Sequence, residues 1–169
     1  MYYRVTKDII TRMSRIPEAL FAEMLPRAIA WAEMQARNIL EHGVDLSPRG
    51  IDVARRAGVL HPERVRSLSV PAIPLPEEED LRQAALGFNL IAPATAGLTL
   101  GYGIFFVERY RGDGPLVAHE LKHVAQYESC GGFDGFLQKY LSEVNEYGYP
   151  AAQMEQEAIA FAESEFPSK

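Results

Sequence analysis

The chain has 169 residues, of which 47% are hydrophobic and 24% are charged. This composition is typical of a folded domain, and the length suits one domain with a core of its own. The formal net charge of −6 argues against nucleic-acid binding, because proteins that bind phosphate backbones usually carry a basic patch. Cys130 is the single cysteine, which excludes an internal disulfide.

The sequence lacks the marks of export and of membrane insertion. The first twenty residues contain no apolar stretch like that of a secretory signal. No run reaches the ~18 apolar residues that a membrane-spanning helix needs. We therefore expect a cytoplasmic, soluble protein without membrane or nucleic-acid partners, and no feature predicts its oligomeric state.

The first 60 residues are expected to be helical. Pro17 is suited to the start of a helix, and Pro26 restarts or kinks that helix before it stops at Gly43. Ser47 has the side chain of an N-cap, and the short helix that follows it ends near Gly58.

Strand patterns appear in the second half of the chain. Residues 64–76 combine β-branched residues with prolines, which is typical of an edge strand or an extended segment. Residues 97–110 form the best strand candidate, with Gly-Tyr-Gly at the centre. Helical patterns cover residues 77–88, 115–129, 133–148 and 150–166. The order of helices, a few strands and then helices predicts an α+β fold.

Two of the four histidines lie four residues apart in the stretch His119-Glu120-Leu121-Lys122-His123. On a helix this spacing places both imidazoles about 40° apart around the axis, so both can reach one ion. Glu120 is rotated by about 100° from His119, which suits a general base that meets a zinc-bound water. The alternative is a helix that carries two histidines with no metal between them.

A catalytic zinc site needs a third protein ligand. His42 and His61 lie far upstream, so a downstream carboxylate is favoured. The candidates are Asp134, Glu143, Glu146, Glu155 and Glu157. In the last predicted helix an apolar stripe of Met154, Ala158 and Phe161 includes Glu157 and leaves Glu155 at its margin. Since a carboxylate on an apolar face is rarely left without a partner, Glu157 is the predicted ligand.

These residues resemble a known family. The stretch "AHELKHVAQYE" is similar to the His-Glu-Leu-x-His-Val-x-Gln signature of small bacterial predicted zinc metallopeptidases of the gluzincin type, and "MEQEAIAFAE" resembles their Glu-x-Glu-Ala segment. The resemblance covers residues 97–162. It implies that His119, His123 and Glu157 bind Zn²⁺ and that Glu120 is the base.

The resemblance also implies a fold, and the sequence departs from the family pattern at one position. The fold is a zincin-like single domain over residues 1–169, with a small sheet and a metal helix packed on C-terminal helices in residues 64–165. The signature residues Leu121, Val124 and Gln126 are expected to serve packing and the helix surface. Position 161, which is acidic in several gluzincins, is occupied by Phe161, so a partner that orients a histidine has to come from elsewhere.

A peptidase also needs a donor for the oxyanion and a place for the substrate. Tyr147 and Tyr149 are the nearest candidate donors in sequence. The backbone of the strand around Gly101 and Gly103 could pair with an extended peptide. The leading hypothesis is therefore zinc-assisted hydrolysis of a peptide or protein substrate. The alternatives are a non-catalytic zinc-binding module that serves protein interactions, and hydrolysis of another kind of bond.

Overall fold

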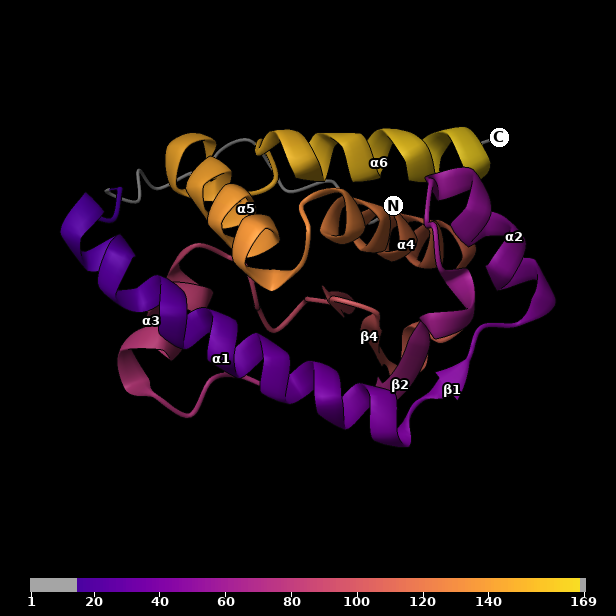
Figure 1. The fold of residues 1–169 in the computed structure, drawn as a ribbon, viewed down its shortest axis with the longest axis horizontal. Coiled ribbons are helices and arrows are strands. Elements are labelled where there is room, and N and C mark those ends of the chain that lie inside the picture. Colours follow the sequence, from indigo (N-terminus) through magenta and orange to yellow (C-terminus); the bar gives the residue numbers. More distant parts are fainter. Residues whose placement is uncertain (1–14, 168–169) are drawn as a thin grey trace.

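The structure is a computed structural model that describes residues 15–167. Within that range it contains six α-helices and a four-stranded mixed sheet, which confirms the predicted α+β class (Figure 1). The helices are α1 (Glu18–His42), α2 (Pro48–Ala57), α3 (Glu79–Gly87), α4 (Gly114–Ser129), α5 (Phe133–Tyr147) and α6 (Gln153–Glu165), the strands are β1 (Val44–Asp45), β2 (Arg66–Val70), β3 (Gly97–Leu100) and β4 (Gly103–Val107), and two short 3₁₀ turns are η1 (Pro62–Arg64) and η2 (Glu108–Tyr110). No helix in the described range has both the length and the apolar character needed to cross a membrane.

The predicted helix boundaries in the first half are largely confirmed. Helix α1 continues through the exposed Pro26 as one helix of 25 residues and ends at Gly43. The Ser47 hydroxyl accepts a hydrogen bond from the Gly50 amide and caps α2. Gly58 follows this helix with φ of 95°, a left-handed conformation that glycine adopts at little cost.

The sheet order is β1-β2-β4-β3, which corrects two strand predictions. Strand β2 pairs with β1 on one side and with β4 on the other, so it is an interior strand and not an edge. The segment 97–110 is not one strand: residues 97–107 form a hairpin, and residues 108–110 form the 3₁₀ turn η2. Gly101 turns the chain with φ of 66°, and Leu100 pairs with Gly103 across the turn. Strand β3 is therefore one edge of the sheet.

Both faces of the sheet are covered by helices, as the side chains of β4 show. Phe105 and Val107 pack in the core cluster that includes α1, whereas Ile104 and Phe106 pack in the cluster that includes α2 and α4. This alternation is the period of two that a strand imposes. A Cβ atom on Gly103 would lie 2.9 Å from Cβ of Ile39, so this glycine allows α1 to approach the sheet.

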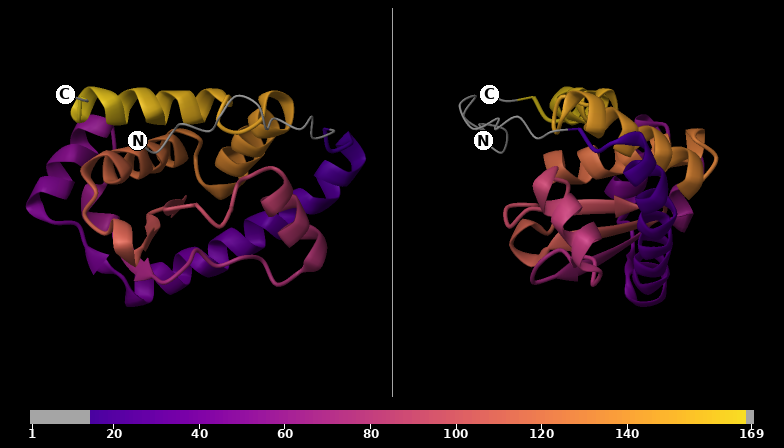
Figure 2. Two further views of the ribbon diagram at one scale, coloured as in Figure 1. Left: turned by 180° about the vertical axis from the view of Figure 1, so that it is seen from behind. Right: turned by 90° about the vertical axis from the view of Figure 1, so that its left-hand side faces the viewer.

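Helices α4 and α6 lie side by side, and α1 runs along the opposite side of the sheet (Figures 1 and 2). Helix α5 contacts both α1 and α4. Because the strand β3 contacts α4, the open edge of the sheet and the predicted metal helix face the same space. This arrangement positions the candidate site.

Candidate metal centre

The site is built on helix α4, whose start is fixed by local chemistry. The carboxylate of Asp113 accepts a hydrogen bond from the Leu116 amide, and Pro115 occupies the first turn. The helix then places His119, Glu120 and His123 at exposures of 5%, 4% and 6%. The predicted helix and the predicted proximity of the two histidines are both confirmed.

The third member of the cluster is Glu155, on α6. Its Oε1 lies 3.1 Å from Nε2 of His123, and its Oε2 lies 3.4 Å from Nε2 of His119. The two histidine Nε2 atoms are 3.1 Å apart. Two ligands at ~2.1 Å from a tetrahedral zinc would lie roughly 3.4 Å from each other. The three side chains therefore have the spacing of a metal-binding triad without any rearrangement.

The buried carboxylate shows an unfilled bonding capacity. Glu155 is 2% exposed, and its Oε2 makes no hydrogen bond within residues 15–167. A buried carboxylate oxygen without such a bond is costly, and a cation would satisfy it. Two imidazole nitrogens and one carboxylate also form a ligand set that suits zinc.

The prediction that Glu157 lies on the buried face is wrong. Glu157 is exposed, and its carboxylate accepts hydrogen bonds from the side-chain amides of Gln126 and Gln153. The buried face of α6 consists of Met154, Glu155, Ala158 and Ala162. Phe161, which supported the predicted stripe, is only partly buried. Alanine at position 162 was the signal for the true face, because it lies one helical turn beyond Ala158.

Gln126 has a role that the sequence did not indicate. It was expected to serve the helix surface, yet it is 6% exposed. Its Nε2 donates to the backbone oxygen of Met154 and to the Glu157 carboxylate, both at 3.0 Å. Its Oε1 therefore accepts from Nδ1 of His123, at 2.8 Å. This bond keeps a proton on Nδ1 and leaves Nε2, which faces Glu155 and His119, as the nitrogen available to a metal.

The charges of the cluster compensate one another. Burial raises the pKa of the Glu155 carboxyl, but the two histidines together lower it by more, so this pKa lies well below its usual range. Burial lowers the pKa of His123, but its hydrogen bond to the Glu155 carboxylate and the negative charges of Glu155 and Glu120 together outweigh burial and raise that pKa to about 9. Without a metal, the carboxylate thus holds a proton on the His123 imidazole. A divalent cation would replace that proton.

Tyr140 of α5 adds a further contact that the sequence did not reveal. Its hydroxyl donates to Oε1 of Glu155 at 2.7 Å, and its ring lies edge-on to His123 with centroids 5.9 Å apart. Burial and the neighbouring Glu155 raise the pKa of this hydroxyl well above its ordinary value, so it remains a donor. The histidine partner that was missing at position 161 is therefore replaced by contacts from Gln126 and Tyr140.

Glu120 points from the same helix toward strand β3. The hydroxyl of Thr99 lies 2.6 Å from Oε2 of Glu120 and 3.0 Å from its backbone oxygen. A Cβ atom at position 97 would lie 2.6 Å from Oε1 of Glu120, so glycine at this position leaves room for the carboxylate. Strand β3 thus positions Glu120 through a hydroxyl and through the absence of a side chain at Gly97.

One cleft of about 840 Å³ is lined by the side chains of His119, Glu120, His123 and Glu155. Tyr149 also lines this cleft, whereas Tyr147 is 58% exposed and is not among the described lining residues. Every residue from Ala94 to Leu100 lines the cleft, so the open edge of β3 faces it. The arrangement can hold a cation beside a carboxylate, next to a strand edge that can pair with an extended chain.

No protein-family model, curated protein or solved structure matched the chain in comparisons with known proteins.

Proposed function

We propose that the protein is a zinc-dependent peptidase with a zincin-like fold, in line with the gluzincin-type resemblance of residues 97–162. The observation that carries the proposal is the convergence of His119, His123 and Glu155 beside Glu120 in one cleft. His119, His123 and Glu155 would hold the zinc. Glu155 takes the place in this proposal that the sequence assigned to Glu157.

Bound zinc supplies Lewis acidity, which lowers the pKa of water and polarises a carbonyl group. Glu120 accepts a proton from the attacking water on its carboxylate and passes it to the leaving amine. The Thr99 hydroxyl keeps the Glu120 carboxylate in place during both transfers. Water adds to the carbonyl carbon, the C–N bond breaks, and the products are a carboxylate and an amine.

Two further elements support a peptide as the substrate. The edge of β3 offers backbone groups to an extended chain along the side of the cleft. Tyr149 lines the cleft and remains a candidate donor to the oxyanion, whereas the exposed Tyr147 is a weaker candidate.

The test separates metal binding from catalysis. Purified protein should contain about one zinc per chain, and the Glu120→Gln variant should keep that zinc while peptide cleavage falls by about 10²–10⁴-fold. The Glu155→Gln variant should lose zinc, and the matched Glu157→Gln variant should retain zinc and activity. The digest should use a peptide library, because the substrate sequence is open.

The outcomes distinguish this proposal from the alternatives. Zinc without any Glu120-dependent cleavage would identify a zinc-binding module. Cleavage by Glu120→Gln at the wild-type rate would refute the role of Glu120. A protein that takes up no zinc even when zinc is added would refute both the peptidase and the zinc-binding module.

A further inference from the structure

The cleft continues well beyond the metal-binding residues into an apolar chamber. We define this chamber by Ala28 and Trp31 of α1, Leu81 and Ala85 of α3, and Leu137 and Leu141 of α5. The three helices lie together at the left of Figure 1. Trp31, Ala85, Leu137 and Leu141 also belong to one packed apolar cluster.

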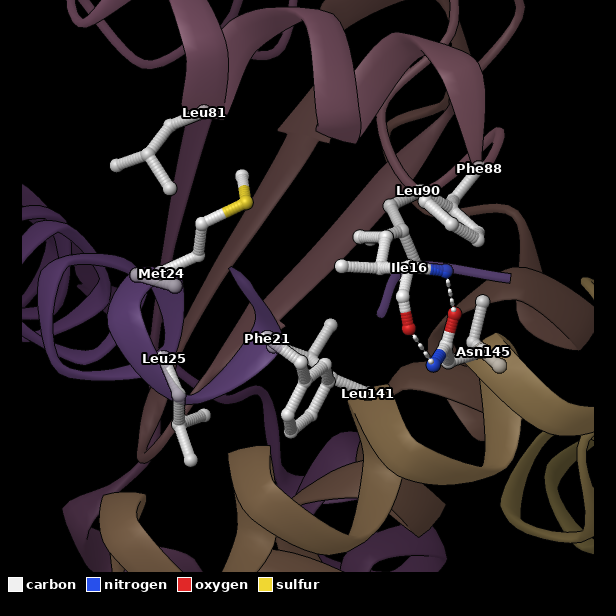
Figure 3. A pocket seen from close by; sticks show the side chains of 11 residues that line it. Ile16, Phe21, Met24, Leu25, Leu81, Phe88, Leu90, Leu141 and Asn145 are labelled. Carbon is white, nitrogen blue, oxygen red and sulfur yellow. Dashed lines mark hydrogen bonds between the residues drawn. The ribbon is translucent and has the colours of Figure 1, made fainter. Parts of the chain in front are cut away.

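A second, smaller cavity extends the same apolar region. It measures about 60 Å³ and shares Ala28, Leu81 and Leu141 with the chamber (Figure 3). At its far end the Asn145 side chain makes two hydrogen bonds to the backbone of Ile16, one from its Nδ2 and one to its Oδ1. The Asn145 amide is thus already paired, and what remains for an occupant is apolar surface.

The chamber lies close to the metal-binding cluster. The stacked rings of Phe136 and Tyr140 belong to the same helix as Leu137, and both line the cleft. The His123 ring lies 6.5 Å from that of Phe136 and 5.9 Å from that of Tyr140, measured between centroids. A peptide held at the cluster can therefore place a neighbouring side chain past these rings into the chamber.

The charges of the cleft restrict what can enter it. Its described lining residues include no lysine and no arginine, whereas Asp113, Glu120, Glu155 and Glu163 contribute carboxylates. An anionic side chain or a free peptide carboxyl terminus that reached the chamber would find no cationic partner among the residues that define it. Removing such a charge from water without a partner is costly. The lining therefore favours neutral apolar groups.

We propose that the chamber binds a bulky, uncharged, apolar side chain of the substrate, such as leucine or phenylalanine, and that the enzyme cuts inside a chain rather than at a free carboxyl terminus. This specificity rests on the proposed peptidase function. Ala28 and Leu141, which form part of both cavities, set the depth that the side chain can reach.

The binding test does not depend on turnover. Trp31 is the only tryptophan in the chain and lines the chamber, so its fluorescence reports on an occupant. The probes are blocked pentapeptides of glycine with leucine, phenylalanine or glutamate at the centre, and laurate. They are titrated into the Glu120→Gln variant and into chelator-treated wild type. We expect the leucine and phenylalanine peptides to bind about ten- to a hundredfold more tightly than the glutamate peptide.

A matched pair of variants locates the binding site. Ala28→Phe fills the chamber and should weaken binding of the apolar peptides at least about tenfold. Ala30→Phe adds the same ring to an exposed position of α1 and should leave binding unchanged. If Ala28→Phe does not fold, the probe series on the Glu120→Gln variant still decides the question.

Equal affinity for the three peptides, or an unchanged Trp31 signal, would overturn the proposal. Tighter binding of laurate than of the leucine peptide would overturn the assignment to a peptide side chain. Selective binding of apolar peptides by a protein that never cleaves them would support the chamber and refute the peptidase, so the two failures can be told apart.

Discussion

Replacement of Gln126 by methionine tests whether this side chain orients His123, the candidate metal ligand. Methionine has a similar length and removes all three hydrogen bonds of the amide. The Met154 carbonyl and Nδ1 of His123 then lose their partner in a buried setting. Each such loss costs about 1–3 kcal/mol, so we expect the free energy of unfolding of the metal-free protein to fall by about 2–6 kcal/mol.

Zinc binding should weaken as well, for a separate reason. When Gln126 no longer accepts a hydrogen bond from Nδ1, the His123 ring can rotate. It can then carry its single proton on Nε2, the nitrogen that faces Glu155. Loss of such an orienting partner typically lowers metal affinity 10–100-fold, about 1.4–2.7 kcal/mol. The assay is a competition titration against a chromophoric chelator, combined with urea unfolding in the presence of a chelator.

The Gln126→Glu variant separates the two effects. It keeps an acceptor for His123 but cannot donate to Met154, and it places a carboxylate beside Glu157. We therefore expect lower stability with zinc affinity close to that of wild type. If Gln126→Met binds zinc as tightly as wild type, the inference that Gln126 orients His123 is refuted.

Three further predictions concern other parts of the chain. Gly97→Ala should displace the Glu120 carboxylate and reduce peptide cleavage while zinc content stays the same, because the added Cβ atom would lie 2.6 Å from Oε1 of Glu120. Normal turnover would contradict this steric argument. Ser47→Ala should lower the free energy of unfolding by about 0.5–2 kcal/mol in urea titrations, because α2 loses its cap, and a smaller change would mean that the cap contributes little. Burial raises the pKa of Tyr102 to about 12, so the unfolded chain ionises first and stability should fall from about pH 10 to 12. Urea unfolding at alkaline pH checks this, and Tyr102→Phe should show a shallower decline.

Helix α4 was predictable because its signals are local. Residues 114–129 contain both histidines at a helical spacing, and the structure confirms the helix and their proximity. The hairpin at residues 97–107 was missed because both of its strands are apolar and its turn is only Gly101 and Tyr102. Strand β1 spans two residues and becomes a strand only through its pairing with β2, which no local pattern shows.

The site partners from other elements were harder to predict, because they depend on how helices pack. Tyr140 meets Glu155 across two helices, and nothing in the sequence of α5 distinguishes it from its other aromatic residues. Glu155 was not predicted as the third ligand because of one assumption about the buried face of α6. Phe161 was taken as part of the buried stripe, although the small side chains of Ala158 and Ala162 mark the face where α6 contacts α4.

The two carboxylates of the Glu-x-Glu segment have different positions because of helix geometry. Residues two apart on a helix lie about 160° from each other around the axis, so Glu155 and Glu157 cannot both face the histidines. Glu155 is buried and meets the Nε2 atoms directly, whereas Glu157 is exposed and holds the amide of Gln126. Gln126 in turn contacts Nδ1 of His123. Glu155 therefore contacts His123 itself, whereas Glu157 reaches it only through Gln126, so Glu157→Gln, whose side-chain oxygen can still accept from Gln126, should retain zinc while Glu155→Gln should lose it.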